Sequence, residues 1–126
     1  MEQYDPLIEP DPEEWLALDE QERIQLVEDY HRRARVRLPR ARRSLHAMMH
    51  AVVENQIAAS EPVLVRHTVQ RLIAEGLDRH DAVHAVASVM LGRMHSAMRD
   101  ADTFSNERYT DELNNLTAEN WQRGDE

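Results

Sequence analysis

The chain has 126 residues, no cysteine, three glycines and a formal charge of −9, and 41% of its residues are hydrophobic. This length suits one domain with one core. The scarcity of glycine and aromatic residues favours helices over sheet, and the absence of cysteine excludes disulfides and thiolate sites. The net acidity argues against non-specific binding of nucleic acid or anionic membranes by the whole domain.

The N-terminal third is predicted to be an acidic arm followed by two helices. Residues 1–10 show no helical period and are expected to form a loose, extended arm. Asp11 then caps a short helix that has proline at its first position. Asp19 and Glu22 have the spacing of a capping box, so a second helix should run from there to about Arg35.

The rest of the chain predicts longer helices joined by short connections. Pro39 lies in an Arg-rich connector over residues 32–43, and Ser44 is expected to cap the helix after it. Gly76 is suited to follow the end of a helix, and Asp78 is suited to cap the next one. The predicted helices span residues 45–59, 62–76, 79–99 and 106–121.

These elements predict an all-α fold, a small antiparallel bundle of about five helices with an extended acidic N-terminal arm. Short loops make sequential helices antiparallel neighbours. We expect a single domain in which residues 1–43 form the acidic arm, short helices and Arg-rich connector, and residues 44–126 form the bundle core. The seven Arg of residues 31–43 are interpreted as neutralising the arm and helix C-termini, because aromatic rings that would stack on nucleic acid are not interleaved with them.

Two histidine ladders lie on the predicted core helices. The segment LHAMMHAVVENQIA places His46, His50 and Glu54 at four-residue steps. The segment RHDAVHAVASVM repeats this step with His80 and His84. A four-residue step advances the direction of a side chain by only about 40°, so each ladder keeps to one side of its helix. Both ladders lie beside the apolar face and should point towards the core.

The ladders predict a divalent metal site. Side chains at i and i+4 reach the same ion, and neutral imidazole and carboxylate are the usual ligands of zinc, iron or manganese. Two helices that each give such a pair would enclose one ion inside the bundle. The candidate ligands are His50, Glu54, His80 and His84, with His46 as a fifth ligand or as support. No organic cofactor is indicated, because a Gly-rich phosphate loop is absent.

A metal-free interpretation stands beside this one. Glu54 could accept hydrogen bonds from both ladders in a structural network, and the chain would then be a non-enzymatic module that binds a protein partner or a second copy of itself. HDAVH also differs from the zinc-peptidase pattern HExxH, because Asp81 is shorter than Glu and points away from the ladder. The residues name no reaction, so whether the protein is an enzyme stays open.

The other histidines provide a comparison. His67 falls opposite the apolar side of its helix and should be exposed. His31, beside the Arg run, and His95 have no histidine four residues away on their own helices, although His95 could approach the site.

The sequence also predicts where the protein is located. The acidic start lacks the features of a signal peptide and no apolar run reaches roughly 18 residues, so we expect a cytoplasmic protein that contacts no membrane.

The two ladder segments resemble the DUF1841 family, small bacterial proteins of unknown function. Its pattern is L-H-x-x-x-H-x-x-x-E-x-Q, followed later by H-x-x-x-H. These positions fall here on Leu45, His46, His50, Glu54, Gln56, His80 and His84. The similarity covers about residues 44–113, and the family's Asn-Pro-Phe run before the first His is Arg-Arg-Ser in this chain. The resemblance implies a histidine-rich helical site and brings no established activity.

Overall fold

The computed structural model describes residues 1–35, 40–100 and 103–123. Within these ranges the chain forms seven helices and no strand, which confirms the all-α prediction with more helices than the expected five or so. The helices are α1 (Pro12–Ala17), α2 (Glu20–Arg33), α3 (Arg40–Ala59), α4 (Val63–Ala74), α5 (Arg79–Arg99), α6 (Asn106–Asn115) and α7 (Ala118–Arg123). Pro39 lies outside the described residues. The antiparallel bundle and the division of the chain at residue 43 stay predictions.

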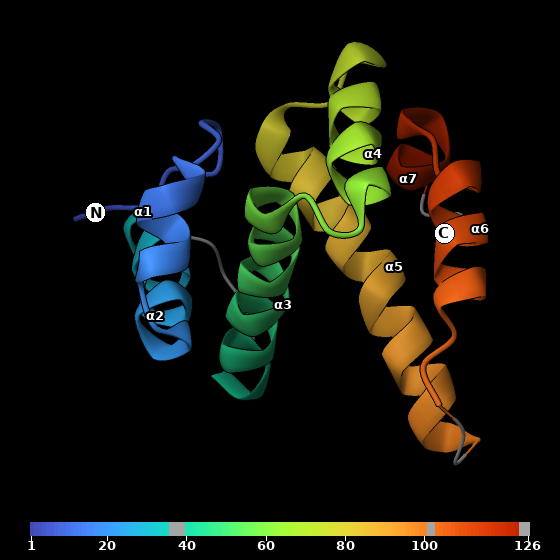
Figure 1. Ribbon diagram of the computed structural model, residues 1–126, viewed down its shortest axis with the longest axis horizontal. Helices are drawn as coiled ribbons and strands as arrows, with labels where there is room; N and C mark the ends of the chain where they lie inside the picture. The colour runs from blue at the N-terminus through green and yellow to red at the C-terminus, as the bar shows by residue number, and fades with distance from the viewer. Residues whose placement is uncertain (36–39, 101–102, 124–126) are drawn as a thin grey trace.

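Helix α3 is central to the arrangement. Figure 1 shows α1 and α2 on one side of it and α4 and α5 on the other, with α6 and α7 beyond them. Two hydrophobic clusters reflect this order. One joins α3 to α4, α5 and α6 around Val53, Val65 and Val86, and the other joins α3 to the arm, α1 and α2 around Val27 and Ala51. Helix α3 therefore buries two faces, and the side between them carries its histidines.

The helix boundaries follow the predicted caps closely. The side chains of Asp11, Asp19 and Asp78 each accept a hydrogen bond from the backbone amide three residues on, and Glu22 completes the capping box. Gly76 follows α4 with φ of +115°. The amide of Leu77 donates to the carbonyl of Leu72, which satisfies a terminal helix carbonyl as in a Schellman motif. These local signals fix the residue at which α5 begins, and α5 carries the second histidine pair, His80 and His84.

Two predicted boundaries were wrong. Helix α3 begins at Arg40, so Ser44 lies inside the helix and does not cap it. Arg and Ala are good helix formers, and the sequence after Pro39 has no residue that delays the helix. The C-terminal helix is broken into α6 and α7, because Leu116 leaves the helical conformation to become buried and the Thr117 hydroxyl accepts a hydrogen bond from the amide of Asn120.

The N-terminal arm is not loose, contrary to the prediction. Tyr4 is 1% exposed, Pro6 is buried, and Trp15 just after the arm is 0% exposed. The rings of Tyr4 and Trp15 lie 5.6 Å apart, and the Trp15 indole donates to Asn55 on α3 at 2.8 Å. The arm is thus held by aromatic anchors, which outweigh the acidic residues that made it look solvated.

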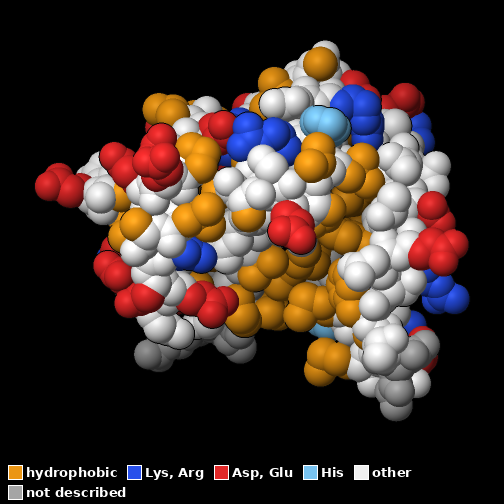
Figure 2. Space-filling view, viewed as in Figure 1, with side chains coloured by type: hydrophobic (Ala, Val, Ile, Leu, Met, Phe, Trp, Pro, Cys, Tyr) orange, Lys and Arg blue, Asp and Glu red, His pale blue; other side chains and the backbone are white. Residues whose placement is uncertain are grey.

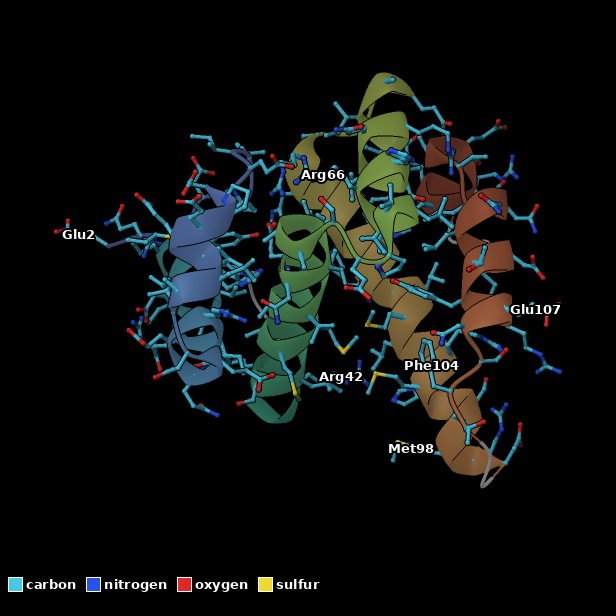
Figure 3. All side chains as sticks on the ribbon, viewed as in Figure 1. Glu2, Arg42, Arg66, Met98, Phe104 and Glu107 are labelled. Carbon is cyan, nitrogen blue, oxygen red and sulfur yellow. The ribbon has the colours of Figure 1, made fainter. Side chains whose placement is uncertain are left out.

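The molecular surface combines charged and apolar regions. Figure 2 shows apolar side chains gathered on one face between α3 and α5, and Met48, Met94 and Met98 are among the exposed apolar residues of these helices. Figure 3 shows Phe104 between α5 and α6, where its ring lies 5.6 Å from that of Tyr109. No helix in the described part of the chain is both long and apolar enough to cross a bilayer.

Candidate metal centre

Five imidazoles from three helices form one cluster. α2 contributes His31, α3 contributes His46 and His50, and α5 contributes His80 and His84. The recorded distances between ring centroids run from 4.5 Å, for His46 and His50, to 6.4 Å, for His80 and His84. His50 is central, because its ring contacts all four others at 5.3 Å or less.

Packing of α2 brings His31 into this cluster. Val27 on α2 is buried against the small side chains of Ala47 and Ala51, which let the two helices approach closely. His31 follows Val27 by four residues and so lies on the same side of α2. It is 7% exposed, although the Arg run begins at the next position.

Hydrogen bonds fix the orientation of His31. Its Nδ1 lies 2.8 Å from the carbonyl oxygen of Val27, and a carbonyl only accepts, so Nδ1–H is the donor. In the neutral ring the Nε2 lone pair then accepts a hydrogen bond from Nε2–H of His46 at 3.2 Å, which an ion would replace. Backbone support of one ring nitrogen while the other faces outward is the usual arrangement of a metal-ligating histidine.

The spacing of the donor atoms fits one ion. Two nitrogens bound to a tetrahedral zinc at its usual bond length lie about 3.3 Å apart, close to the 3.2 Å between the Nε2 atoms of His31 and His46. With His50 included, one ligand atom from each of the three residues lies within 4.8 Å of the others. All three would bind one ion if the longer separations closed to about 3.3 Å.

His50 makes no hydrogen bond that would account for its burial. It is 0% exposed, and neither ring nitrogen has a partner in the described part of the chain. Nε2 of His80 is also buried without one. Most buried polar atoms in folded proteins are hydrogen-bonded, and each exception calls for an explanation such as an ion or a water. The unpartnered imidazole nitrogens belong to two neighbouring rings, whose centroids lie 5.3 Å apart.

The cluster favours neutral imidazoles. Burial lowers the pKa of His31, His46, His50, His80 and His84, and nearby histidines lower the pKa values further, to about 4 for His46. Asp78, Asp81 and Glu54 oppose the shift at His80 without reversing it. At neutral pH the rings therefore keep the lone pairs that a metal needs.

The carboxylate of Glu54 has other partners. Arg79 donates to both of its oxygens, from Nη1 at 2.8 Å and from Nη2 at 2.7 Å, and the Tyr4 hydroxyl donates to Oε2 as well. Glu54 is 1% exposed and Arg79 8%. Burial and the charge of Glu54 raise the pKa of Tyr4 well above its ordinary value. Burial alone would lower the pKa of Arg79, but Glu54 raises it overall.

Of the five candidate ligands, the structure places His46 and His50 with His31 in a group with metal-ligand spacing. It brings the rings of His80 and His84 beside them and pairs Glu54 with Arg79. Sequence reasoning missed His31 as a member, because its own helix has no second histidine. The available signal was its four-residue step from Val27 on the apolar side of α2. His67 and His95 are exposed, which confirms the expectation for His67.

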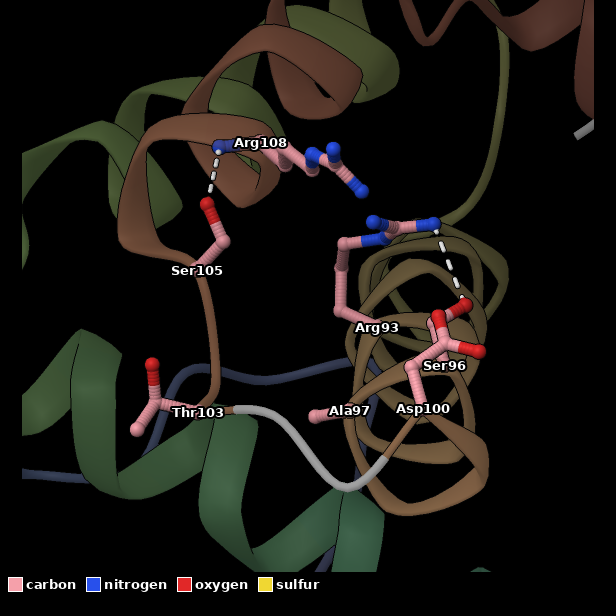
Figure 4. A pocket seen from close by; sticks show the side chains of 7 residues that line it. All are labelled: Arg93, Ser96, Ala97, Asp100, Thr103, Ser105 and Arg108. Atoms are coloured by element: carbon pink, nitrogen blue, oxygen red, sulfur yellow. Dashed lines mark hydrogen bonds between the residues drawn. The ribbon is translucent and has the colours of Figure 1, made fainter.

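A surface pocket at the junction of α5 and α6 has different chemistry. Its volume is about 290 Å³, and Figure 4 shows the guanidinium groups of Arg93 and Arg108 facing each other across it. The Arg93 guanidinium is already paired with Glu112 at 2.9 Å and with the hydroxyl of Ser96 at 3.3 Å. The carboxylate of Asp100 also lines this pocket. The charges are largely balanced, so the histidine cluster is the stronger candidate site.

Comparison with known proteins supports the sequence resemblance. The family model described as a domain of unknown function, DUF1841, matches residues 2–115. This range is wider than the expected 44–113, and it includes Tyr4 and His31 but ends before α7. No curated protein and no solved structure matches the chain.

Proposed function

Because the chain belongs to the DUF1841 family, whose description assigns no function, we propose a function from the geometry of its site: the protein binds one divalent transition-metal ion. His31, His46 and His50 are the proposed ligands. His80 and His84 flank the ion from α5 and complete its coordination or bind its water. In this proposal Glu54 holds Arg79 rather than the metal.

The central position of His50 is the observation that carries this proposal. A buried imidazole without a hydrogen-bond partner costs free energy, on the order of 1–3 kcal/mol for each unsatisfied group. In a metal-free network of the kind that Glu54 was expected to organise, His50 would have a carboxylate or carbonyl partner, and it has neither in the described residues. An ion bound by His50 and its neighbours would compensate this cost.

The donor set indicates which ions fit. Imidazole suits zinc, copper, iron and nickel, whereas magnesium, calcium and manganese prefer carboxylate and carbonyl oxygens. Since the Glu54 carboxylate is engaged by Arg79 and Tyr4, the ligand atoms of the described residues that lie close enough to share an ion are imidazole nitrogens. We therefore propose zinc or ferrous iron before manganese.

Elemental analysis of protein purified without a histidine tag tests the proposal. We expect about one zinc or iron per chain after incubation with the ion and gel filtration. His50→Ala and His31→Ala should each lose most of this metal. His67→Ala is the matched control, because it removes an exposed imidazole from α4 and should leave the stoichiometry unchanged.

Two results would contradict the proposal. One is an absence of tightly bound metal after incubation with zinc, ferrous iron, copper and nickel in turn. The other is equal loss of metal in His50→Ala and His67→Ala, which would show adventitious surface binding. Circular dichroism should confirm that each variant retains its helices.

A further inference from the structure

The N-terminal arm, residues 1–10, is attached to the helices that carry the histidines. Arg33 at the end of α2 donates to the carbonyl oxygen of Tyr4 at 3.2 Å. Arg79 at the start of α5 donates to the carbonyl oxygen of Pro6 at 3.0 Å, and Glu54 on α3 accepts from the Tyr4 hydroxyl. Each of the three helices that supply imidazoles therefore also holds the arm.

A fourth contact fixes the far end of the arm. Arg66 on α4, labelled in Figure 3, lies 3.7 Å from the carboxylate of Glu9 and donates to the carbonyl oxygen of Ile57. The arm thus runs across α2, α3, α4 and α5. Its two buried residues, Tyr4 and Pro6, make the first three of these four contacts.

The residues that hold the arm are close neighbours of residues in the histidine cluster. Arg79 directly precedes His80, and Glu54 follows His50 by one helical turn. The ring of Tyr4 lies 6.2 Å from that of Tyr30, which itself lies 5.4 Å from His80 and 5.5 Å from His31. The bidentate Arg79–Glu54 pair joins α3 to α5 at the residue before His80 and one helical turn after His50.

We propose that Tyr4, Glu54 and Arg79 are positioning residues that couple docking of the N-terminal arm to metal binding by the histidine cluster. This inference rests on the proposed function. With the arm docked, Tyr4 and the Pro6 carbonyl satisfy the buried Glu54–Arg79 pair, and the pair holds α3 and α5 at the spacing that the imidazoles need. With the arm released, the pair loses two of its hydrogen bonds and admits water. Because coupling between two sites is reciprocal, a bound ion should also stabilise the docked arm.

Two measurements on the full-length chain test the coupling, with zinc as the probe. The first is hydrogen exchange of the amides of residues 1–10, which should slow when zinc is added. The second is the rate of zinc loss to a chelator. Tyr4→Phe keeps the ring and removes the hydroxyl, so zinc should dissociate about tenfold faster, the lower end of the effect of residues that support metal ligands.

Tyr109→Phe is the matched control. Tyr109 is 3% exposed and its hydroxyl also donates to a residue of α3, Gln56, but this contact involves neither the arm nor the histidines. The zinc dissociation rate of Tyr109→Phe should equal that of the wild type.

If Tyr4→Phe does not fold, Arg33→Met provides a milder change, because it removes the hydrogen bond from Arg33 to the Tyr4 carbonyl and keeps the Tyr4 side chain. It should speed dissociation by about threefold, as expected for one hydrogen bond.

The outcomes separate the two proposals. If the wild type binds none of zinc, ferrous iron, copper and nickel, both the metal site and the coupling are wrong. If the wild type binds zinc but Tyr4→Phe, or Arg33→Met in its place, releases it no faster than Tyr109→Phe, the coupling alone is wrong. Unchanged exchange of the arm on zinc addition would overturn the coupling in the same way.

Discussion

His50 shows how a single buried residue links stability to the proposed function. Its ring is surrounded by four imidazoles and has no hydrogen-bond partner among the described residues. A residue of this kind destabilises the metal-free protein, and selection for stability alone would replace it with an apolar side chain. Its presence at the centre of the cluster therefore supports the proposed binding of an ion.

His50→Leu should stabilise the metal-free protein while abolishing metal binding. Leucine has a similar volume and leaves no polar atom unsatisfied, so the free energy of unfolding should rise by about 1–3 kcal/mol. Urea denaturation in the presence of a chelator measures this change. A fall in stability would show that His50 has a partner in the metal-free protein and would weaken the case for an ion.

Arg79 should be among the residues whose loss costs most stability. Arg79→Met leaves the Glu54 carboxylate buried without its cationic partner, and removal of one member of a buried ion pair typically costs about 3–5 kcal/mol. The free energy of unfolding from urea denaturation should fall by this amount. The double variant Glu54→Leu with Arg79→Met should recover part of the loss, because it removes the isolated charge.

Arg32→Met is the control for the loss of an ion pair. It breaks the surface pair with Asp29, in which the Arg32 side chain is 75% exposed, so its cost should not exceed about 1 kcal/mol. Equal costs for Arg79→Met and Arg32→Met would show that loss of the buried pair costs no more stability than loss of the surface pair.

At the scale of elements, α5 depends on the turn that precedes it. Gly76 after α4 and the Asp78 cap of α5 set the residue at which α5 begins. They therefore set the position along α3 at which His80 and His84 pack. Only glycine adopts φ of +115° without strain. The turn thus helps to position the imidazoles of α5, and the Asp78 carboxylate also acts electrostatically on His80.

Two glycine substitutions should change stability in opposite directions. Gly76→Ala introduces a Cβ at a positive φ, which should lower the free energy of unfolding by about 1–2 kcal/mol. Gly92→Ala lies inside α5, where a Cβ meets nothing within 4 Å. It should raise the free energy of unfolding by up to about 1 kcal/mol through helix propensity. Urea denaturation compares the two, and a stabilising Gly76→Ala would contradict the assigned turn.

At the scale of the whole molecule, the histidine cluster makes stability depend on pH. Each of the five rings has a lower pKa in the folded protein than in the unfolded chain, where histidine titrates near 6.5. The unfolded chain therefore binds more protons between these pKa values, and stability rises with pH in this window. In the opposite direction, stability is lost as the pH falls from about 6.5 towards the folded value of about 4 for His46.

Thermal unfolding of the metal-free protein should follow this dependence. The melting temperature should fall steadily as the pH is lowered from 7 towards 4, because protons bind preferentially to the unfolded chain. In a His46→Leu and His50→Leu double variant the slope should be smaller, since two of the shifted groups are gone. A slope equal to that of the wild type would assign the acid sensitivity to carboxylates elsewhere.

Local patterns in the sequence determined most of the helices, their caps and the side of each helix on which the ladders lie. These features depend on residues within four positions of each other, such as Asp19 with Glu22 or His80 with His84, and the helical repeat translates such spacings directly into geometry. Local patterns do not predict which residues of different helices contact each other across the core. The expectation of an all-α fold rested on the same local information.

Only the tertiary structure decided which residues meet. Tyr4 and Glu54 are fifty positions apart, Glu54 and Arg79 twenty-five, and His31 and His46 fifteen. Their contacts depend on how α2, α5 and the arm pack on α3. Packing is a property of whole surfaces and outweighs the local signals of acidity or of an Arg run. This is why His31 joined the cluster, Glu54 turned to Arg79, and an arm expected to be loose became part of the core.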